Sequence, residues 1–421
     1  MHILVLEPEP SSTRGGQEVV LFDFCRGLQQ RGHQITLIYN KEGNLLKHYQ
    51  EFCRQTLKVN RFIIYRPSHL FSFVADLKKV IDKVPLIQNT IILCNQFQDT
   101  PFGHALSLSQ DIPLVCYLHL PPPLIVPKWQ WNKGPKGVKH FISLSNIQFQ
   151  WNLGLKGVQH FIAVSNQTKL DWVKRGYKED IIDVVHNGIH LDVYKPLNKH
   201  SLMRKEWNIP EHTRVISYVG RIDQVKGLET LLKAFASLLL STKAKLLIAG
   251  KPLNQGEEYQ KSLEELAINL GIENHVNFLG HITNTTSLYQ ISDITVLPSL
   301  WSEPFGRVIV ESMASGTPVV ASRIGGISEV LTGEFKNGLF EPGNERDLSA
   351  TLSRMMDWRD RDPHLAQRCR QHIISKFGVD KMVDGIEKVL EKISCEPERS
   401  QNYPKSHLLL MQHTGGDLDE R

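Results

Sequence analysis

Short apolar runs alternate with amphipathic stretches along most of this chain, and turn residues separate them. Runs rich in β-branched residues predict strands at 3–6, 34–39, 61–65, 90–94, 114–119, 161–165, 182–186, 215–219, 245–249, 276–279, 294–297 and 319–321. The spacing of apolar residues predicts helices at 17–30, 71–81, 167–175, 228–240, 259–270, 306–314, 345–356 and 363–377. Apolar strands that alternate with amphipathic helices are typical of parallel sheets covered by helices on both faces.

The alternation runs through two successive series, which predicts two Rossmann-like domains that face each other across a cleft. A length of 421 residues fits two domains, at about 150 residues each. We expect a first domain at 1–187, a linker at 188–212, a second domain at 213–376, a terminal helix at 377–395 that crosses back to the first domain, and a disordered tail at 396–421.

A tandem duplication interrupts the first series. Residues 131–142 are repeated, with few changes, at 151–162, and the related region extends over 131–170. One interpretation is a tolerated surface insertion, and the other is an acceptor-binding loop at the mouth of the cleft. Only one copy can supply the strand that leads to the Asn187-Gly188 turn, and we expect the second copy to do so because it runs continuously into that turn.

Composition excludes several function classes. The six cysteines are scattered, with no Cys-x-x-Cys, which argues against a zinc ribbon, an iron–sulfur cluster or a disulfide framework. A net charge of +5 over this length does not favour a nucleic-acid partner. The sequence shows no secretory signal and no apolar run of about 20 residues, so we expect a cytoplasmic protein. Lys78, Lys79 and Lys83 follow the apolar stretch 70–74, and this pattern fits either a solvated helix or peripheral contact with the inner face of a membrane.

Polar residues at the ends of the first-domain strands are candidates for ligand binding. Gly15-Gly16 follows the first strand and precedes a helix, where bare backbone and free N–H groups favour an anion or form an ordinary tight turn. The loop matches neither the dinucleotide-binding pattern nor the nucleoside-triphosphate pattern. His119 follows the apolar run 114–118, and three prolines begin two residues later. This histidine is either an ordinary surface residue or a substrate contact.

The second domain opens with a glycine-flanked loop that carries two cations. Arg221 and Lys226 lie five residues apart between Gly220 and Gly227. A guanidinium and an ammonium on one rigid loop suit a diphosphate whose charge grows as a bond breaks. The alternative is a solvated basic turn.

The most specific segment is residues 302–321. Pro304 is expected in the first turn of a helix, and the N–H groups near Gly306 and Arg307 then point toward an anion. Glu303 precedes this helix, and Glu311 lies about two turns along it, where a carboxylate can accept hydrogen bonds from a ribose diol. The alternative is a plain amphipathic helix.

Together, these motifs resemble the family 4 retaining glycosyltransferases over roughly residues 1–394. The resemblance implies a metal-independent, cofactor-free transfer of a sugar, with retention, from a UDP- or GDP-sugar bound to the second domain. It assigns catalytic roles to Arg221, Lys226, Glu303 and His119. The donor-binding residues that it implies, together with our own choice of Ile282 near the nucleobase, are Gly15, Gly16, Asn187, Gly188, Ile282, Phe305, Gly306, Arg307, Val308 and Glu311. The acceptor is expected to be a glycan or a lipid-linked sugar of the cell envelope.

Two other functions stay open on sequence grounds. A sugar-nucleotide epimerase or a phosphorylase can use the same two-domain architecture, since function depends on the site. A non-catalytic nucleotide-sugar-binding protein, disabled by the duplication, is the other. The Asp-x-Asp sequences at 360–362 and 417–419 lie in a charged stretch and in the tail, so neither is expected to bind a metal.

Overall fold

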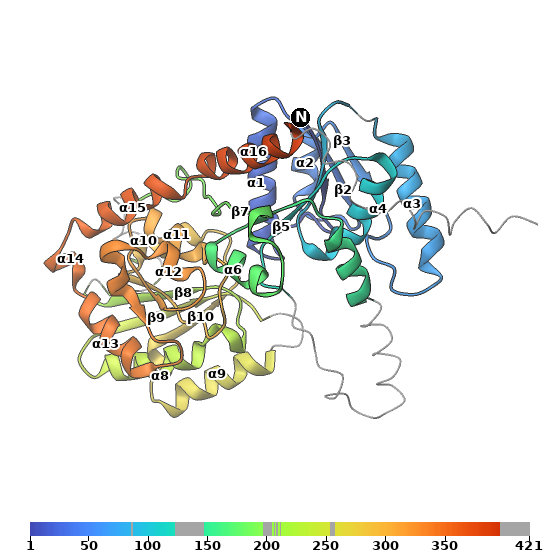
Figure 1. The fold of residues 1–421 in the computed structure, drawn as a ribbon. Helices are drawn as coiled ribbons and strands as arrows, with labels where there is room; N and C mark the ends of the chain where they lie inside the picture. The colour runs from blue at the N-terminus through green and yellow to red at the C-terminus, as the bar shows by residue number, and fades with distance from the viewer. Residues whose placement is uncertain are drawn as a thin grey trace, which may run out of the picture.

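The computed structural model describes residues 1–85, 87–122, 147–196, 204–205, 207, 209–210, 212–252 and 257–395. Within these residues, two parallel sheets form the centres of two α/β domains (Figure 1). The predicted fold class is confirmed. The first copy of the duplication (131–142) and the tail 396–421 lie outside the described residues, as do residues 197–203, 206, 208 and 211 of the predicted linker.

The first sheet has seven strands in the order β3-β2-β1-β4-β5-β6-β7, all parallel. Its strands are β1 (His2–Leu6), β2 (Gln34–Tyr39), β3 (Gln55–Lys58), β4 (Thr90–Cys94), β5 (Leu114–Leu118), β6 (His160–Ala163) and β7 (Ile182–Val184). The helices of this domain are α1 (Gly16–Gln30), α2 (Leu46–Phe52), α3 (His69–Lys83), α4 (Thr100–Gln110) and α6 (Asn166–Lys174), with short 3-10 turns η1 (Phe97–Asp99) and η2 (Glu179–Ile181).

The second sheet has six parallel strands in the order β10-β9-β8-β11-β12-β13. Its strands are β8 (Arg214–Val219), β9 (Ala244–Ala249), β10 (Val276–Gly280), β11 (Ile294–Leu297), β12 (Val319–Ser322) and β13 (Leu339–Phe340). The helices that follow are α8 (Leu228–Leu239), α9 (Glu257–Asn269), α10 (Thr285–Ile291), α11 (Arg307–Ala314), α12 (Ile327–Val330), α13 (Glu345–Met355), α14 (Trp358–Arg361), α15 (Leu365–Lys376) and α16 (Val379–Cys395), and the 3-10 turns are η3 (Gln224–Lys226), η4 (Glu273–His275) and η5 (Gly333–Gly338).

One predicted strand is wrong. Residues 61–65 are not a strand, and the edge strand β3 lies earlier, at Gln55–Lys58. The carboxylate of the buried Asp76 accepts hydrogen bonds from the backbone N–H and the amide of Asn60, which fixes a turn after β3. Phe62 and Ile63 then bury their side chains without joining the sheet.

The second copy of the duplication supplies β6, as expected. β6 pairs in parallel with β5 and β7, and the helical residues 147–156 precede it. Gly154 and Gly157 lie directly against α4: a Cβ on Gly157 would come within 1.7 Å of the Nδ1 atom of His104. This copy is therefore part of the packed first domain.

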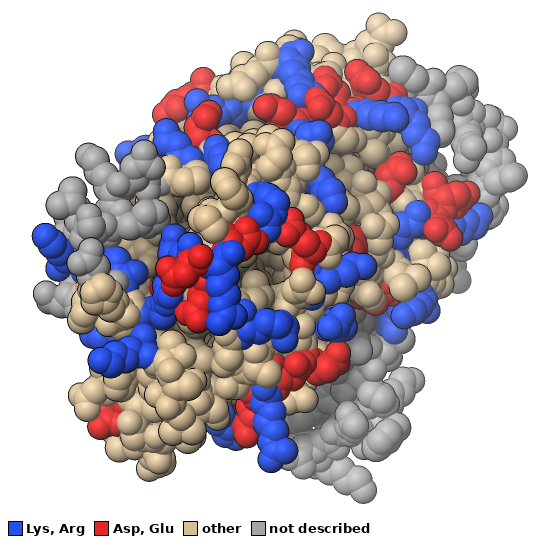
Figure 2. Space-filling view, turned by 90° about the vertical axis from the view of Figure 1, so that its left-hand side faces the viewer, with Lys and Arg blue, Asp and Glu red and all other residues tan. Residues whose placement is uncertain are grey.

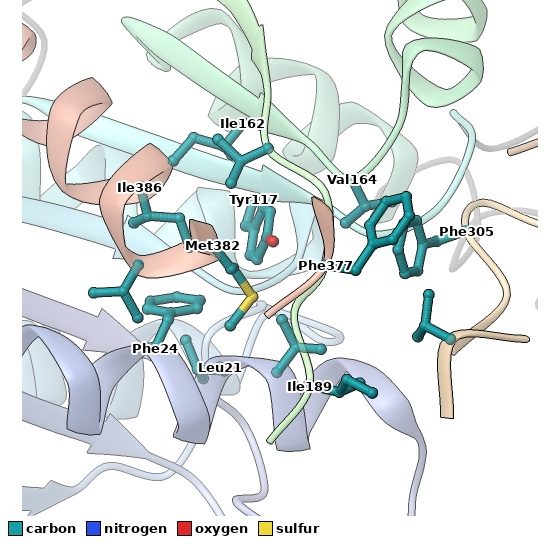
Figure 3. Close-up of a cluster of buried hydrophobic side chains, with 14 of the residues drawn as sticks. Leu21, Phe24, Tyr117, Ile162, Val164, Ile189, Phe305, Phe377, Met382 and Ile386 are labelled. Atoms are coloured by element: carbon teal, nitrogen blue, oxygen red, sulfur yellow. The ribbon is translucent and has the colours of Figure 1, made fainter. Parts of the chain in front are cut away.

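The two domains share an apolar cluster near the point where the chain returns from the second domain to the first. Helix α16 starts beside the second domain and lies along α1 of the first (Figure 1). Met382 and Ile386 of α16 pack with Phe24 of α1, while Phe377 packs with Phe305 of the second domain (Figure 3). This continuous core holds the carboxyl ends of both sheets on either side of one cleft.

The surface carries both charge signs in alternation. On the face shown in Figure 2, Lys and Arg side chains are interspersed with Asp and Glu. Along the described ranges, no helix is both long and apolar enough to cross a bilayer.

Candidate active site

A cavity of about 530 Å³ lies between the two domains, at the carboxyl ends of strands from both sheets. The sequence-predicted residues that line it are Gly15, Gly16, His119, Asn187, Arg221, Lys226, Glu303, Phe305, Gly306, Arg307 and Val308. Residues scattered over some 290 positions of the chain therefore meet in one site. This is the place where ligands bind in open parallel sheets.

Two helix N-termini approach each other across the cavity. Helix α1 begins at Gly16 and α11 begins at Arg307. A Cβ on Gly16 would lie 3.0 Å from the Cδ atom of Arg307, so glycine permits this close approach of the two domains. Both helices direct their free N–H groups and the positive ends of their dipoles toward the same region, which favours an anion there.

The start of α11 differs from the sequence prediction in one respect. Pro304 does not lie in the first turn, because the N-cap is Gly306, which adopts a left-handed conformation with φ of 86°. Glycine adopts this conformation without the steric cost that a Cβ brings. The sharp turn at Gly306 leaves the buried Phe305 and the half-buried Val308 on the cavity wall.

Lys226 and Glu303 form the central ion pair of the site. The Nζ atom of Lys226 bonds to Oε1 of Glu303, and the two side chains are only 12% and 9% exposed. The same Oε1 atom accepts hydrogen bonds from the hydroxyl of Ser299 at 2.6 Å and from the indole N–H of Trp301 at 3.0 Å. In addition, Nζ lies 5.3 Å from the centre of the Trp301 ring. The Glu303 carboxylate is thus held in place by three hydrogen-bond donors, from Lys226, Ser299 and Trp301.

Arg221 lies on the same wall with more freedom. Its side chain is 42% exposed, and its described ion pair is a loose contact of 3.9 Å with Asp223.

Lys226 ends the 3-10 turn η3, and Gly227 follows with φ of 69°. A Cβ on Gly227 would lie 2.0 Å from the carbonyl oxygen of Pro298, so this loop requires glycine.

Glu311 lies behind the cavity wall rather than on it. Its Oε2 atom accepts a hydrogen bond of 2.9 Å from the hydroxyl of Tyr289, and its Oε1 atom accepts one of 3.1 Å from Nε of Arg307. Glu311 is buried, and burial together with the Glu311 charge raises the pKa of Tyr289. The carboxylate therefore fixes the side chain of Arg307 at the start of α11.

His119 follows β5 and is buried at the edge of the cavity. Its Nε2 atom lies 2.9 Å from Oδ1 of Asn95, and its ring packs 4.2 Å from the ring of Tyr117. Burial lowers the pKa of His119 to about 3, so the imidazole is neutral near pH 7. The Tyr117 hydroxyl donates to Oδ1 of Asn187, which lines the cavity.

Gly188 was predicted to bind the donor, but the structure gives it a different role. Its N–H contacts the sulfur of Met382 at 3.2 Å, and a Cβ would lie 2.7 Å from the carbonyl oxygen of Gly378. It does not line the cavity. Gly188 instead permits the backbone to pass closely beneath the start of α16.

A second cavity of about 430 Å³ shares Thr13, Arg14 and the residues from Val219 to Arg221 with the first cavity. On the second domain, it is lined by His281 and Ile282. On the first domain, it is lined by Thr13 and Arg14. A Cβ on Gly250 would lie 1.7 Å from the carbonyl oxygen of Gly220, so the floor of this cavity is two closely packed backbone segments. The shared lining residues show that the two cavities adjoin.

Sequence reasoning missed several residues around the site. Ser299, Trp301 and Tyr289 hold the predicted glutamates. Asn95 holds His119, and Glu7 holds Asn95; each is the first residue after an apolar strand, β4 or β1. That position was a usable signal, because polar residues at the carboxyl ends of adjacent parallel strands meet at one edge of the sheet. In the described ranges, no three or more His, Cys, Asp or Glu side chains are grouped to hold a metal. The expected metal independence stays a prediction.

The sequence matches known glycosyltransferase families in two consecutive segments. Residues 14–193 match the family described as Glycosyltransferase Family 4, and residues 200–373 match the family described as Glycosyl transferases group 1. An uncharacterized glycosyltransferase of Methanocaldococcus jannaschii is 31% identical over 210 residues, which is 48% of this chain and 52% of that protein. The D-inositol 3-phosphate glycosyltransferase of Mycolicibacterium smegmatis is 33% identical over 207 residues, which is 49% of this chain and 46% of that protein. These matches span about half the length of the curated relatives.

Solved structures extend the likeness to nearly the whole chain at the level of fold. Anabaena HepE in complex with UDP and glucose gives a TM-score of 0.75 at 22% identity, covering 92% of this chain and 99% of that one. A glycosyltransferase from Rickettsia africae gives 0.75 at 21% identity, covering 94% and 99%. The two family matches are consecutive and together cover most of the chain, each on one of the two Rossmann-like domains that share the cavity. The chain therefore belongs to the family 4 type of glycosyltransferases.

Proposed function

We propose that this protein transfers a sugar from a UDP- or GDP-sugar to a glycan or lipid-linked acceptor, with retention at the anomeric carbon and without a metal or other cofactor. The observation that carries the proposal is the convergence of Lys226, Arg221 and the N-terminus of α11 on one cavity between the domains. This arrangement supplies positive charge where a nucleoside diphosphate would leave.

The chemistry that this cavity supports follows from the charge that develops. Cleavage of the bond from the sugar to the diphosphate leaves an additional negative charge on a phosphate oxygen. Lys226 and Arg221 would stabilise that charge directly, and the first N–H groups of α11 would do so through hydrogen bonds. The acceptor hydroxyl would then attack on the face that the diphosphate leaves, with the leaving phosphate as the base, as the family resemblance implies.

The remaining predicted residues would hold the donor. Glu303 faces the cavity beside Lys226 and would accept hydrogen bonds from sugar hydroxyls. Glu311 would contact the ribose, which requires a small shift because it lies behind Arg307. The second cavity, at Ile282, would take the nucleobase. Anabaena HepE has been solved with UDP and with UDP-glucose, which makes UDP the first nucleotide to test.

Helix α3 supports a proposal of peripheral membrane contact for a lipid-linked acceptor, at the cytoplasmic face. Phe71 is 84% exposed and Val74 is 53% exposed, and Lys78 and Lys83 follow on the same helix. Exposed apolar side chains beside cations are typical of helices that bind anionic lipid surfaces. Co-sedimentation with anionic vesicles should exceed that with zwitterionic vesicles and should fall in a Phe71→Ser variant. Equal binding to both vesicles would contradict this part of the proposal.

Transfer is tested with radiolabelled UDP-glucose and GDP-mannose, a panel of acceptors, and excess EDTA. We expect a glycosylated product whose anomeric configuration matches that of the donor, at a rate that EDTA does not change. Loss of activity in EDTA would contradict metal independence, and an inverted product would contradict retention. A reaction without acceptor that yields an epimerised donor would instead indicate a sugar-nucleotide epimerase. Nucleotide binding without turnover on any acceptor would indicate a non-catalytic protein.

A further inference from the structure

Three polar side chains form a line along the carboxyl edge of the first sheet. Glu7, Asn95 and His119 each follow directly after a strand, and those strands, β1, β4 and β5, are neighbours in the sheet. The amide nitrogen of Asn95 donates to Oε2 of Glu7 at 2.5 Å, and Oδ1 of Asn95 lies 2.9 Å from Nε2 of His119. All three residues are at most 8% exposed.

The orientation of the Asn95 amide follows from its partner. The other oxygen of Glu7 also faces donors: it accepts from the backbone N–H of Glu9 at 3.1 Å and lies 3.7 Å from Nη1 of Arg14. When the Glu7 carboxylate is ionised it only accepts hydrogen bonds, so Asn95 then presents its NH₂ group to Glu7 and its oxygen to His119. His119 must then carry its proton on Nε2.

The other ring nitrogen of His119 is left for a ligand. The described residues provide no hydrogen bond to Nδ1, and His119 lines the cavity beside Asn187. In a neutral imidazole with the proton on Nε2, Nδ1 is an acceptor. A hydroxyl in the cavity is the donor that fits it.

We propose that ionised Glu7 and Asn95 are positioning residues that fix the Nε2–H tautomer of His119, so that Nδ1 accepts a hydrogen bond from a substrate hydroxyl. The substrate part of this proposal rests on the proposed glycosyltransferase function. The tautomer part rests only on the three side chains and their hydrogen bonds.

An exchange of amide and carboxylate tests the arrangement. In Glu7→Gln, the carbonyl oxygen is needed opposite Glu9 N–H and Arg14, so the NH₂ group faces Asn95. The Asn95 amide then turns, donates to Nε2, and leaves His119 protonated on Nδ1. In the double variant Glu7→Gln/Asn95→Asp, the new carboxylate accepts from both neighbours and restores the Nε2–H tautomer.

The tautomer is read by NMR of the full chain labelled with ¹⁵N-histidine, with the His119 signals assigned by their absence in His119→Gln. Burial raises the pKa of Glu7 to about 8, with Glu18 adding to the shift and Arg14 opposing it, so the spectra are recorded at pH 9, where the carboxylate is ionised. We expect Nε2–H in the wild type, Nδ1–H in Glu7→Gln, and Nε2–H again in the double variant. A wild-type Nδ1–H signal, or a tautomer that Glu7→Gln leaves unchanged, would overturn the proposal.

Turnover at the same pH gives the second measurement. Glu7→Gln should lower kcat by about tenfold or more, since the substrate hydroxyl loses its acceptor and must turn to accept from Nδ1–H instead. The double variant should recover most of this loss. Asp76→Asn is the matched control, because Asp76 is also a buried carboxylate that bonds to an asparagine, Asn60, but lies outside the cavity. It should change neither the tautomer nor kcat. If the tautomer changes with the substitutions as expected but the wild type transfers no sugar, the proposed function is refuted and the positioning role is supported. If kcat falls equally in the single and the double variant, the contact between His119 and the substrate is refuted.

Discussion

The ion pair between Lys226 and Glu303 predicts that substituting its two members changes nucleotide affinity in opposite directions. In the structure, Glu303 holds the ammonium group that a diphosphate would need. If the proposed function holds, donor binding would therefore compete with Glu303 for Lys226. Removing the lysine should weaken both nucleotide binding and turnover, whereas neutralising the glutamate should strengthen nucleotide binding and still weaken turnover.

The contacts set the size of each effect. Lys226→Met removes a cation aimed at the leaving group, and such a loss typically lowers kcat by about 10²- to 10³-fold, or about 2.7–4 kcal/mol. The free energy of unfolding should fall by only about 1–3 kcal/mol, because Ser299 and Trp301 still donate to the Glu303 carboxylate. Glu303→Gln removes a competing charge-assisted interaction of about 1.5–3 kcal/mol, which corresponds to UDP binding about 10- to 150-fold tighter.

Calorimetric titration with UDP, together with the transfer assay, separates these effects. Lys233→Met is the control, because Lys233 also pairs with a glutamate, Glu345 at 3.9 Å, but both side chains are half exposed on helices outside the cavity. It should leave UDP affinity and kcat unchanged. A Lys226→Met variant with near-wild-type turnover would refute the role of Lys226. Weaker UDP binding in Glu303→Gln would refute the competition between Glu303 and the diphosphate.

Three further predictions concern the ribose, the domain contact and the duplication. Glu311→Gln should remove the preference for UDP over 2′-deoxy-UDP in calorimetric titrations; a preference that persists would exclude a ribose contact. Glu329 accepts hydrogen bonds from His186, Asn166 and Gln167 of the first domain, and these outweigh burial, which acts in the opposite direction, and hold its pKa below the ordinary value. Its contribution to stability is therefore present at pH 7 and is lost as the pH falls through that lowered pKa, so urea unfolding should find Glu329→Gln less stable than wild type at pH 7 and closer to it at pH 3. Gly157→Ala should lower the free energy of unfolding by about 1–3 kcal/mol, since its Cβ would meet the His104 ring; an unchanged thermal midpoint would contradict the packing of the second copy.

Local pattern was sufficient for most of the fold. Apolar runs such as 90–94 and 114–118 have the length and composition of buried parallel strands, and both are strands of the first sheet. The segment 61–65 has the same composition, but Asp76 fixes a turn before it, and that carboxylate lies on a helix that the sequence pattern does not connect to it. Helix α4 was not predicted, because its segment lacks a clear polar face and carries Pro101.

The site was predictable where one segment contains the whole chemistry. The glycine-flanked Arg221 and Lys226 and the segment from Glu303 to Glu311 carry their signal in adjacent residues. The partners of these residues come from elsewhere: Ser299 and Trp301 could be found nearby, but Tyr289 reaches Glu311 only through packing of α10 on α11. The line from Glu7 to His119 depends on β1 lying beside β4, a neighbour relation that sequence order does not provide.

The approach of α1 and α11 gives a physical reason for donor binding to hold the domains together. Both helices direct positive dipole ends into the cavity, and Gly16 brings the first within contact of Arg307 at the second. Two like poles at this distance repel each other, and the repulsion decreases when an anion lies between them. A diphosphate in that position would turn the repulsion into two favourable interactions, one with each domain. Its departure would restore the repulsion, so loss of the leaving group from the site would favour opening of the cleft.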